Sequence, residues 1–181
     1  MILLGASCTV NKWSLPKDLG LVQPVNVVQG DSVSNFNYIK SQVKVNDQKM
    51  YYWYDGNQIG HTKGDYIGKL LDGKIIVRDL KNENVILIGY FKNGLRDGFW
   101  SFFDNEGIYK KQIFSNGELD GWTEVLSGEK CVSKSLYRDG EIKKKIIYSD
   151  STTKVTYKNG VPNDTVKVGG FIKRIIGKNN K

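Results

Sequence analysis

A chain of 181 residues with 39% hydrophobic and 25% charged residues has the composition of a folded domain rather than of a disordered or fibrous chain. Twenty glycines, ten tyrosines and only three prolines favour many tight turns between short strands. No run of about 18 apolar residues occurs, so we expect no transmembrane helix. A single histidine and two distant cysteines argue against a metal site and against a structural disulfide.

The net charge of +8 is concentrated in the last quarter of the chain. Residues 140–181 carry ten lysines or arginines against three acidic residues. A basic end of this kind either attracts an acidic lipid, nucleic acid or protein, or simply keeps the protein soluble as a solvated tail.

The first residues are apolar, then small, and end immediately before Cys8. This pattern resembles the last part of a bacterial lipoprotein signal, in which the cysteine is lipidated, although seven residues are too few for a complete signal. We therefore expect either that the true start lies upstream and Cys8 is a lipid anchor, or that the cysteine is there by chance. The rest of 1–35 has no period and is broken by proline and glycine, which predicts an extended lead-in.

A tetrad then recurs along the chain: an aromatic or large apolar residue, any residue, Asn or Asp, and Gly. Its glycines are separated by 17, 21, 23, 23 and 20 residues, a near-constant interval that is typical of a repeat protein. The six copies are Trp53–Gly56, Leu70–Gly73, Phe91–Gly94, Phe114–Gly117, Tyr137–Gly140 and Tyr157–Gly160.

The tetrad predicts a β-hairpin. Asn-Gly and Asp-Gly tolerate the positive φ angles of a type I′ turn, whose twist matches that of two antiparallel strands. The aromatic residue lies three positions before the glycine, in the incoming strand, where a flat side chain packs well on a pleated surface.

Two consecutive copies agree over a longer frame. Gly94 and Gly117 are each followed four residues later by a second Asp-Gly glycine, Gly98 and Gly121, and an aromatic follows closely. The sequence therefore predicts an all-β fold over 36–168, an elongated antiparallel meander of repeated hairpins in which each unit is stabilised by its neighbours. It would follow an irregular N-terminal extension and precede a short C-terminal tail.

That tail, 169–181, is basic and carries apolar residues with helical spacing. The positively charged residues Lys173, Arg174 and Lys178 flank or lie between these apolar positions. The tail either caps the terminal strand of the sheet or lies on an anionic membrane.

The stretch from Phe91 to Gly107 resembles the bacterial variant of the MORN repeat (membrane occupation and recognition nexus). That pattern runs aromatic-x-Asn-Gly, a glycine four residues later, further aromatics and another turn glycine. The copies at Tyr137 and Tyr157 match only the first half, because Lys144 and Asp164 stand where the second glycine would be. The resemblance implies an elongated hairpin array that acts as a scaffold in protein assembly or at a membrane surface. Bacterial variants often resemble envelope lipoproteins, and some are described as antitoxin-like.

The residue patterns favour no catalytic chemistry. Asp55, Asp72, Asp97 and Asp120 all precede a turn glycine, which indicates a structural role, and His61 has no second histidine or cysteine nearby. No dinucleotide-binding or phosphate-binding glycine motif occurs. We therefore expect a non-enzymatic protein without a cofactor, metal ion or small-molecule substrate.

The aromatic residues are the better candidates for function. They either pack against one another or leave an uncovered stripe where a protein partner docks. We expect a protein-binding or scaffold protein at a bacterial cell envelope, with the alternative of a soluble antitoxin- or immunity-like inhibitor of a toxic protein. The basic tail is the candidate for a membrane-surface contact, and a nucleic-acid partner is disfavoured. The candidate partner-binding residues are Trp53, Trp100, Phe103, Trp122, Tyr137 and Tyr157, and the turn-forming repeat glycines are Gly56, Gly73, Gly94, Gly98, Gly117, Gly121, Gly140 and Gly160.

Overall fold

The structure is a computed structural model that describes residues 25–148, 151–158 and 160–169. Those residues form fifteen strands and no helix. The first eight are β1 (Val25–Gln29), β2 (Ser32–Phe36), β3 (Met50–Tyr54), β4 (Ile59–Lys63), β5 (Lys69–Leu70), β6 (Gly73–Asp79), β7 (Val85–Lys92) and β8 (Leu95–Asp104). They are followed by β9 (Gly107–Ser115), β10 (Glu118–Leu119), β11 (Gly121–Ser127), β12 (Lys130–Arg138), β13 (Glu141–Ile147), β14 (Ser151–Lys158) and β15 (Val161–Gly169).

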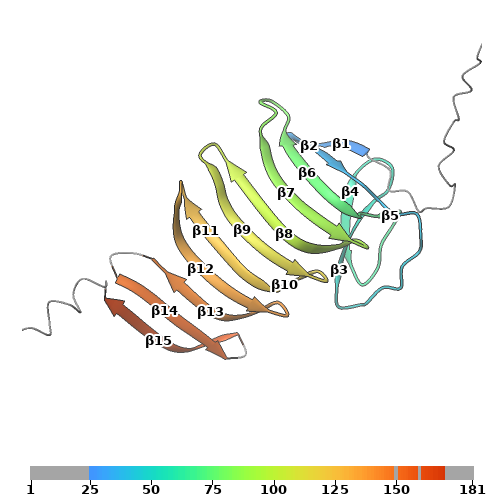
Figure 1. Cartoon of the computed structure of the whole chain (residues 1–181). Helices are drawn as coiled ribbons and strands as arrows, with labels where there is room; N and C mark the ends of the chain where they lie inside the picture. Colours follow the sequence, from blue (N-terminus) through green and yellow to red (C-terminus); the bar gives the residue numbers. More distant parts are fainter. Residues whose placement is uncertain (1–24, 149–150, 159, 170–181) are drawn as a thin grey trace, which may run out of the picture.

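Twelve of the strands form one long sheet in the order β1-β2-β6-β7-β8-β9-β11-β12-β13-β14-β15, with β10 paired to β9. From β6 onward, strands that follow one another along the chain are neighbours and antiparallel, so the sheet is a meander. Figure 1 shows this progression as a continuous change of colour across the sheet. The predicted all-β antiparallel hairpin meander is therefore confirmed.

The hairpin corners have the backbone conformation that the Asn/Asp-Gly pairs predict. Asn93 and Gly94 have φ angles of 52° and 79°, and Asn116 and Gly117 have φ angles of 49° and 89°. Asp139 is likewise at 48°. Positive φ at both central residues is the signature of the type I′ turn, and asparagine, aspartate and glycine are the residues that adopt it most readily.

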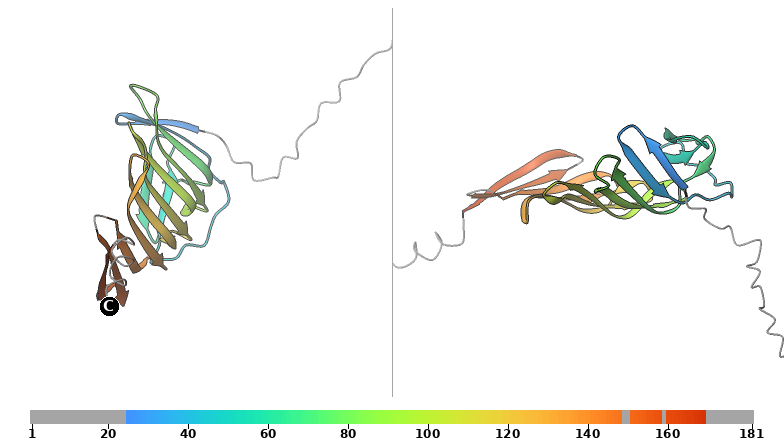
Figure 2. Two further views of the ribbon diagram at one scale, coloured as in Figure 1. Left: turned by 60° about the vertical axis from the view of Figure 1, so that its left-hand side comes forward. Right: turned by 90° about the horizontal axis from the view of Figure 1, so that it is seen from above.

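A second, three-stranded sheet in the order β4-β3-β5 is inserted between β2 and β6. Its aromatic side chains meet those of the long sheet: the Tyr52 and Phe91 rings are 5.0 Å apart, and the Tyr54 and Phe36 rings are 5.4 Å apart. Figures 1 and 2 place this small sheet at the β1–β8 end of the molecule, whereas β11–β15 extend beyond it as a single layer.

The small sheet divides the long sheet into two unlike faces. Side chains alternate across a strand, so the register assigns each residue to one face. We call the face that contacts the small sheet the inner face; it carries Phe36, Phe91, Trp100 and Phe114. The opposite face is the outer face; it carries Ile76, Ile88, Phe99, Ile113 and Trp122.

The main core lies on the inner face. The rings of Phe91 and Trp100 meet edge to face at 5.1 Å, and those of Trp100 and Phe114 meet in the same way at 5.9 Å. The Arg96 guanidinium lies over the Trp100 ring, 4.7 Å from its centroid, where a cation is attracted by the ring quadrupole. A smaller cluster, Tyr51, Trp53 and Leu70, fills the small sheet.

Hydrogen bonds between successive hairpin corners tie the repeats together. The Gly94 amide donates to the Leu71 carbonyl over 2.8 Å, and the Gly117 amide donates to the Arg96 carbonyl over the same distance. The Gly140 amide repeats the contact with the Leu119 carbonyl at 2.9 Å. In each case the acceptor is the carbonyl of the residue that precedes the Asp of the previous repeat. These hydrogen bonds therefore connect neighbouring repeats in addition to the strand pairing.

Three expectations need correction. The sequence predicts an extended lead-in over 1–35, but residues 25–35 belong to the paired strands β1 and β2 and the turn between them. Gly56 lies in the β3–β4 connection of the small sheet and not in a repeat of the long sheet. Gly73 opens β6 and forms no hairpin corner.

Gly73 forms no corner because Asp72-Gly73 corresponds to the second glycine pair of a repeat, such as Asp97-Gly98, and not to the first pair, such as Asn93-Gly94, which makes the corner. The Asp72 carboxylate accepts the Asn93 amide at 2.8 Å, as the Asp97 carboxylate accepts the Asn116 amide at 3.3 Å. The four corners at Gly94, Gly117, Gly140 and Gly160 join strands as predicted.

Throughout residues 25–148, 151–158 and 160–169, no helix is long and apolar enough to cross a bilayer.

Candidate partner-binding surface

The outer face exposes a large aromatic side chain in the middle of the sheet. Phe99, in β8, is 71% exposed, more than any other large apolar residue of the described chain. It faces Ile113 across the β8–β9 pairing. Exposure of a phenylalanine at the centre of a sheet, rather than at a loop or edge, costs apolar burial that a bound partner would restore.

Phe99 forms one wall of a hollow on this face. The hollow has a volume of about 200 Å³ and is lined chiefly by Phe99, Ile113, Trp122, Lys111, Glu124 and Lys134, with Gln112 contributing; we call it the outer hollow. The lining comes from four neighbouring strands, β8, β9, β11 and β12, whose register brings every one of these side chains except Gln112 to the outer face.

The charged residues of the outer hollow follow one cross-strand row. Glu124 is paired in register with Lys111 on one side and Lys134 on the other. The Lys134 ammonium bonds the Glu124 carboxylate at 2.6 Å and also lies 4.8 Å from the centre of the Trp122 ring. The hydrogen bond to Glu124 is the main cause that raises the pKa of Lys134; burial opposes it, and the Coulombic attraction of Glu124 adds a smaller effect in the same direction as the hydrogen bond.

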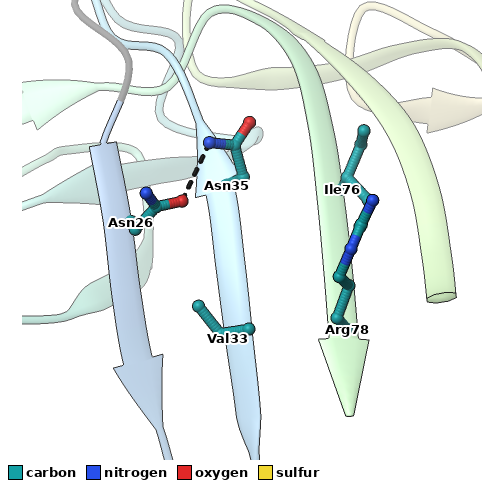
Figure 3. A pocket seen from close by; sticks show the side chains of 5 residues that line it. All are labelled: Asn26, Val33, Asn35, Ile76 and Arg78. Carbon is teal, nitrogen blue, oxygen red and sulfur yellow. Dashed lines mark hydrogen bonds between the residues drawn. The ribbon is translucent and has the colours of Figure 1, made fainter. Parts of the chain in front are cut away.

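A second hollow lies on the same face, near the first strands. It has a volume of about 240 Å³ and is lined by Asn26, Val33, Asn35, Ile76 and Arg78. Figure 3 shows these side chains on β1, β2 and β6, with the Asn35 amide donating to the Asn26 side-chain oxygen at 2.9 Å. Of these two depressions, the outer hollow has the aromatic lining.

Two of the predicted partner-binding residues belong to the core. Trp53 is 8% exposed and Trp100 is 2% exposed. The Trp53 indole donates to the Thr62 hydroxyl at 2.9 Å inside the small sheet. Trp100 lies between Phe91 and Phe114 on the inner face. Neither ring is available to a partner, because the side chains of the two buried clusters surround them.

The remaining predicted aromatics are half-buried and do not form one stripe. Trp122 lines the outer hollow. Tyr137 pairs with Gly121 in β11, and Tyr157 pairs with Pro162 in β15, both beyond the part of the sheet that the small sheet covers. Phe103 lies near the far end of β8, opposite Ile108. The predicted anchor Cys8 and the tail residues Lys173, Arg174 and Lys178 lie outside the described residues.

Phe99 is not among the partner-binding residues predicted from the sequence. Strand alternation was the available signal: adjacent residues in a strand point to opposite faces. Since Trp100 is buried on the inner face, Phe99 must point outward.

Three of the aspartates accept hydrogen bonds from backbone amides, in agreement with their predicted structural role. The Asp55 carboxylate accepts the Asn57 and Gln58 amides, each at 2.8 Å, while Asp72 and Asp97 accept amides of the following repeat. His61 is exposed in β4, with its ring 5.5 Å from that of Tyr52. Within the part of the chain that the structure describes, no three His, Cys, Asp or Glu side chains gather closely enough to hold a metal ion.

Comparisons with protein-family models, with curated proteins and with solved structures each found no match for this chain. The geometry defines the class: a β-hairpin repeat protein. The small sheet covers the inner face at one end, and the outer face bears the outer hollow with its exposed aromatic side chain.

Proposed function

We propose that this chain is a non-catalytic protein-binding repeat protein of the MORN-like type that works as a scaffold at a bacterial cell envelope, with the outer hollow as its contact site. The observation that carries the proposal is the 71% exposure of Phe99 beside Ile113 and Trp122. Aromatic side chains that gather in a depression are the residues that contribute most to protein interfaces.

The architecture supports a scaffold role. Each repeat is held by strand pairing and by the corner-to-corner hydrogen bonds, so the outer face is a rigid surface rather than a set of loops. A rigid surface loses little conformational entropy when it binds, which favours association through a modest contact area.

Photo-crosslinking tests the proposal. Benzoyl-phenylalanine is introduced in place of Phe99 in the cells that make the protein, and the adducts are identified by mass spectrometry. The matched control places the same group at Leu80, a 48% exposed apolar residue just after β6 and outside the outer hollow. We expect a discrete protein adduct from position 99 and none from position 80.

Absence of any protein adduct at position 99, or identical adducts at both positions, would contradict the proposal. Cell fractionation of the adduct distinguishes a scaffold at the envelope from a soluble inhibitor. An adduct in the envelope fraction supports the scaffold, whereas a soluble adduct with a toxic protein supports the inhibitor.

The proposed anchor to the envelope is Cys8. A cysteine that follows apolar and small residues is the acceptor pattern of bacterial lipoproteins, and it is the only sequence feature that supports an anchor. Labelled palmitate should enter the product of the full-length gene and should be absent from the Cys8→Ser variant. If the unchanged protein takes up no label, the anchor is wrong, and the protein-binding proposal stands or falls separately.

A further inference from the structure

We infer that the outer hollow receives an apolar side chain carried by an acidic segment of a partner protein. This inference rests on the proposed function and names the chemistry of the partner. It draws on the shape of the outer hollow, on its apolar lining and on the charges at its margin.

The shape favours a single inserted side chain. At about 200 Å³ the outer hollow is smaller than the roughly 300–1,000 Å³ of sites that enclose a small-molecule ligand. Its walls come from side chains of adjacent strands, so it is a depression in a surface and not an enclosed cavity. A side chain that projects from another protein fits such a depression, and the surrounding sheet contacts the rest of the segment.

The lining favours an apolar inserted group. Phe99, Ile113 and Trp122 give the outer hollow its apolar walls, and the Lys134 ammonium lies over the Trp122 ring. An aromatic or aliphatic side chain placed there would remove the Phe99 ring from water, and burial of apolar surface favours binding.

The charges favour an acidic segment around the inserted group. Glu124 lies between Lys111 and Lys134 and is bonded to Lys134, so its charge is compensated. No salt bridge joins Lys111 to another residue among the described parts of the chain. Two more lysines lie on the outer face in the next strands: Lys144 of β13 lies opposite Leu136, and Lys154 of β14 lies opposite Ile146. Carboxylates of a partner segment would pair with these lysines.

An anionic membrane has similar charge but fits the surface less well. Insertion into a bilayer needs apolar side chains that protrude together from one surface, whereas Ile113 and Trp122 are half-buried at the bottom of a depression. A protein segment is therefore the occupant that the observations favour.

Peptide binding to the purified full-length chain provides the test. The probes are fluorescently labelled short peptides of equal length: one rich in Asp and Glu with a central Phe, one with Ala in place of that Phe, and one with Lys in place of the acidic residues. Fluorescence anisotropy gives the Kd, and the indole N–H resonance of Trp122 reports whether the outer hollow is the site. We expect the acidic Phe peptide to bind most tightly and to shift the Trp122 resonance.

Two variants test the two halves of the inference. Phe99→Ser should weaken binding of the acidic Phe peptide about tenfold, because a central aromatic contact is lost. Lys111→Glu should weaken it by a similar factor and should shift the preference toward the basic peptide. Leu80→Ser is the matched control and should leave the Kd unchanged. Thermal unfolding of each variant verifies that the fold is retained.

Several results would overturn the inference: no binding of the acidic Phe peptide, equal binding of acidic and basic peptides, or no effect of Lys111→Glu. Tighter binding to phosphatidylglycerol vesicles than to the peptide would assign the surface to a membrane instead. If crosslinking at position 99 captures a protein while the acidic peptides fail, the proposed function survives and only the partner chemistry is wrong.

Discussion

At the scale of single residues, the position of Trp100 depends on a glycine in the neighbouring strand. Trp100 lies over Gly89, where an added Cβ atom would be only 2.4 Å from the indole ring. Gly60 has the same relation to Trp53 in the small sheet, at 2.3 Å. These two glycines leave room for the large side chains of the two clusters, which explains why glycine occurs inside strands, where it otherwise lowers stability.

Gly89→Ala should therefore destabilise the protein by about 1–3 kcal/mol, because the methyl group overpacks the core. Urea unfolding followed by tryptophan fluorescence measures the change in the free energy of unfolding. Trp100→Phe supplies a smaller ring, so the same alanine should cost clearly less in that background. An equal cost in both backgrounds would show that the indole contact is not the cause.

The charge of Asp55 makes the stability of the protein depend on pH. Hydrogen bonds from the Gln58 and Asn57 amides, with the Gln58 bond the larger effect, hold the pKa of this fully exposed carboxyl below its ordinary value of 3.8. A pKa that is lower in the folded state means that the stabilisation is present above the ordinary pKa and is lost as the pH falls through the folded value.

The Asp55→Asn variant keeps the acceptor oxygen but does not titrate. The difference in unfolding free energy between the original protein and Asp55→Asn should be constant between about pH 5 and 7 and should shift below about pH 4 in the direction of lower relative stability of the original protein. Urea unfolding at a series of pH values measures this difference. A difference that does not change below pH 4 would contradict the role of the carboxylate charge.

At the scale of elements, each hairpin is joined to the next by side-chain and backbone hydrogen bonds as well as by strand pairing. The Asp72 carboxylate accepts the Asn93 amide at 2.8 Å, and the Gly94 amide reaches the Leu71 carbonyl. Because an aspartate in one repeat orders the corner of the following repeat, folding of one hairpin favours folding of the next. This is the nearest-neighbour coupling expected of repeat proteins.

Asp72→Ala should cost about 1 kcal/mol and should speed hydrogen exchange of the Asn93 amide, because that amide loses its acceptor. Asp72→Asn keeps an acceptor and should cost less. The comparison variant is Asp104→Ala, which removes a bond of 2.9 Å to the Glu106 amide within a single turn. Exchange measured by NMR should show an effect of Asp104→Ala at Glu106 and none at Asn93. Unchanged exchange at Asn93 in Asp72→Ala would refute the coupling.

At the scale of the whole molecule, the core is distributed unevenly along the array. The buried apolar side chains of the described residues all lie between Val27 and Phe114. From β11 to β15 the sheet is a single layer, and over residues 121–148, 153–158 and 160–166 the side chains are half-buried or exposed apart from Ser135. Since burial of apolar surface is the main favourable contribution to folding, stability should fall from the small sheet toward β15.

Hydrogen exchange in increasing urea should show this gradient. Amides of β14 and β15 should exchange through local opening at urea concentrations where amides of β7 and β8 remain protected. The midpoint reported by tryptophan fluorescence, which includes the buried Trp53 and Trp100, should follow the later event. A single exchange free energy shared by β7 and β15 would show that the array unfolds as one unit.

Features that depend on a few adjacent residues were predicted from the sequence, and features that depend on contacts between distant segments were not. The four corners from Gly94 to Gly160 were predicted because the φ angles of a type I′ turn restrict the residues at two adjacent positions. The small sheet was not predicted, since Trp53–Gly56 and Leu70–Gly73 resemble the repeat locally but pair with other strands. Asp72-Gly73 has the right residues for a corner, and only its contact with Asn93 shows that it belongs to the second half of a repeat.

The amino-acid sequence by itself determined the antiparallel hairpins, because turn chemistry and strand alternation act over a few residues. The tertiary structure alone decided which aromatic rings are buried, because burial depends on where the small sheet packs. Tyr52 of the small sheet packs against Phe91, which contacts the buried Trp100 on the inner face, whereas Phe99, the residue before Trp100 in the same strand, lies on the outer face. A surface of this kind is created when distant segments meet, and no local pattern specifies which segments these are.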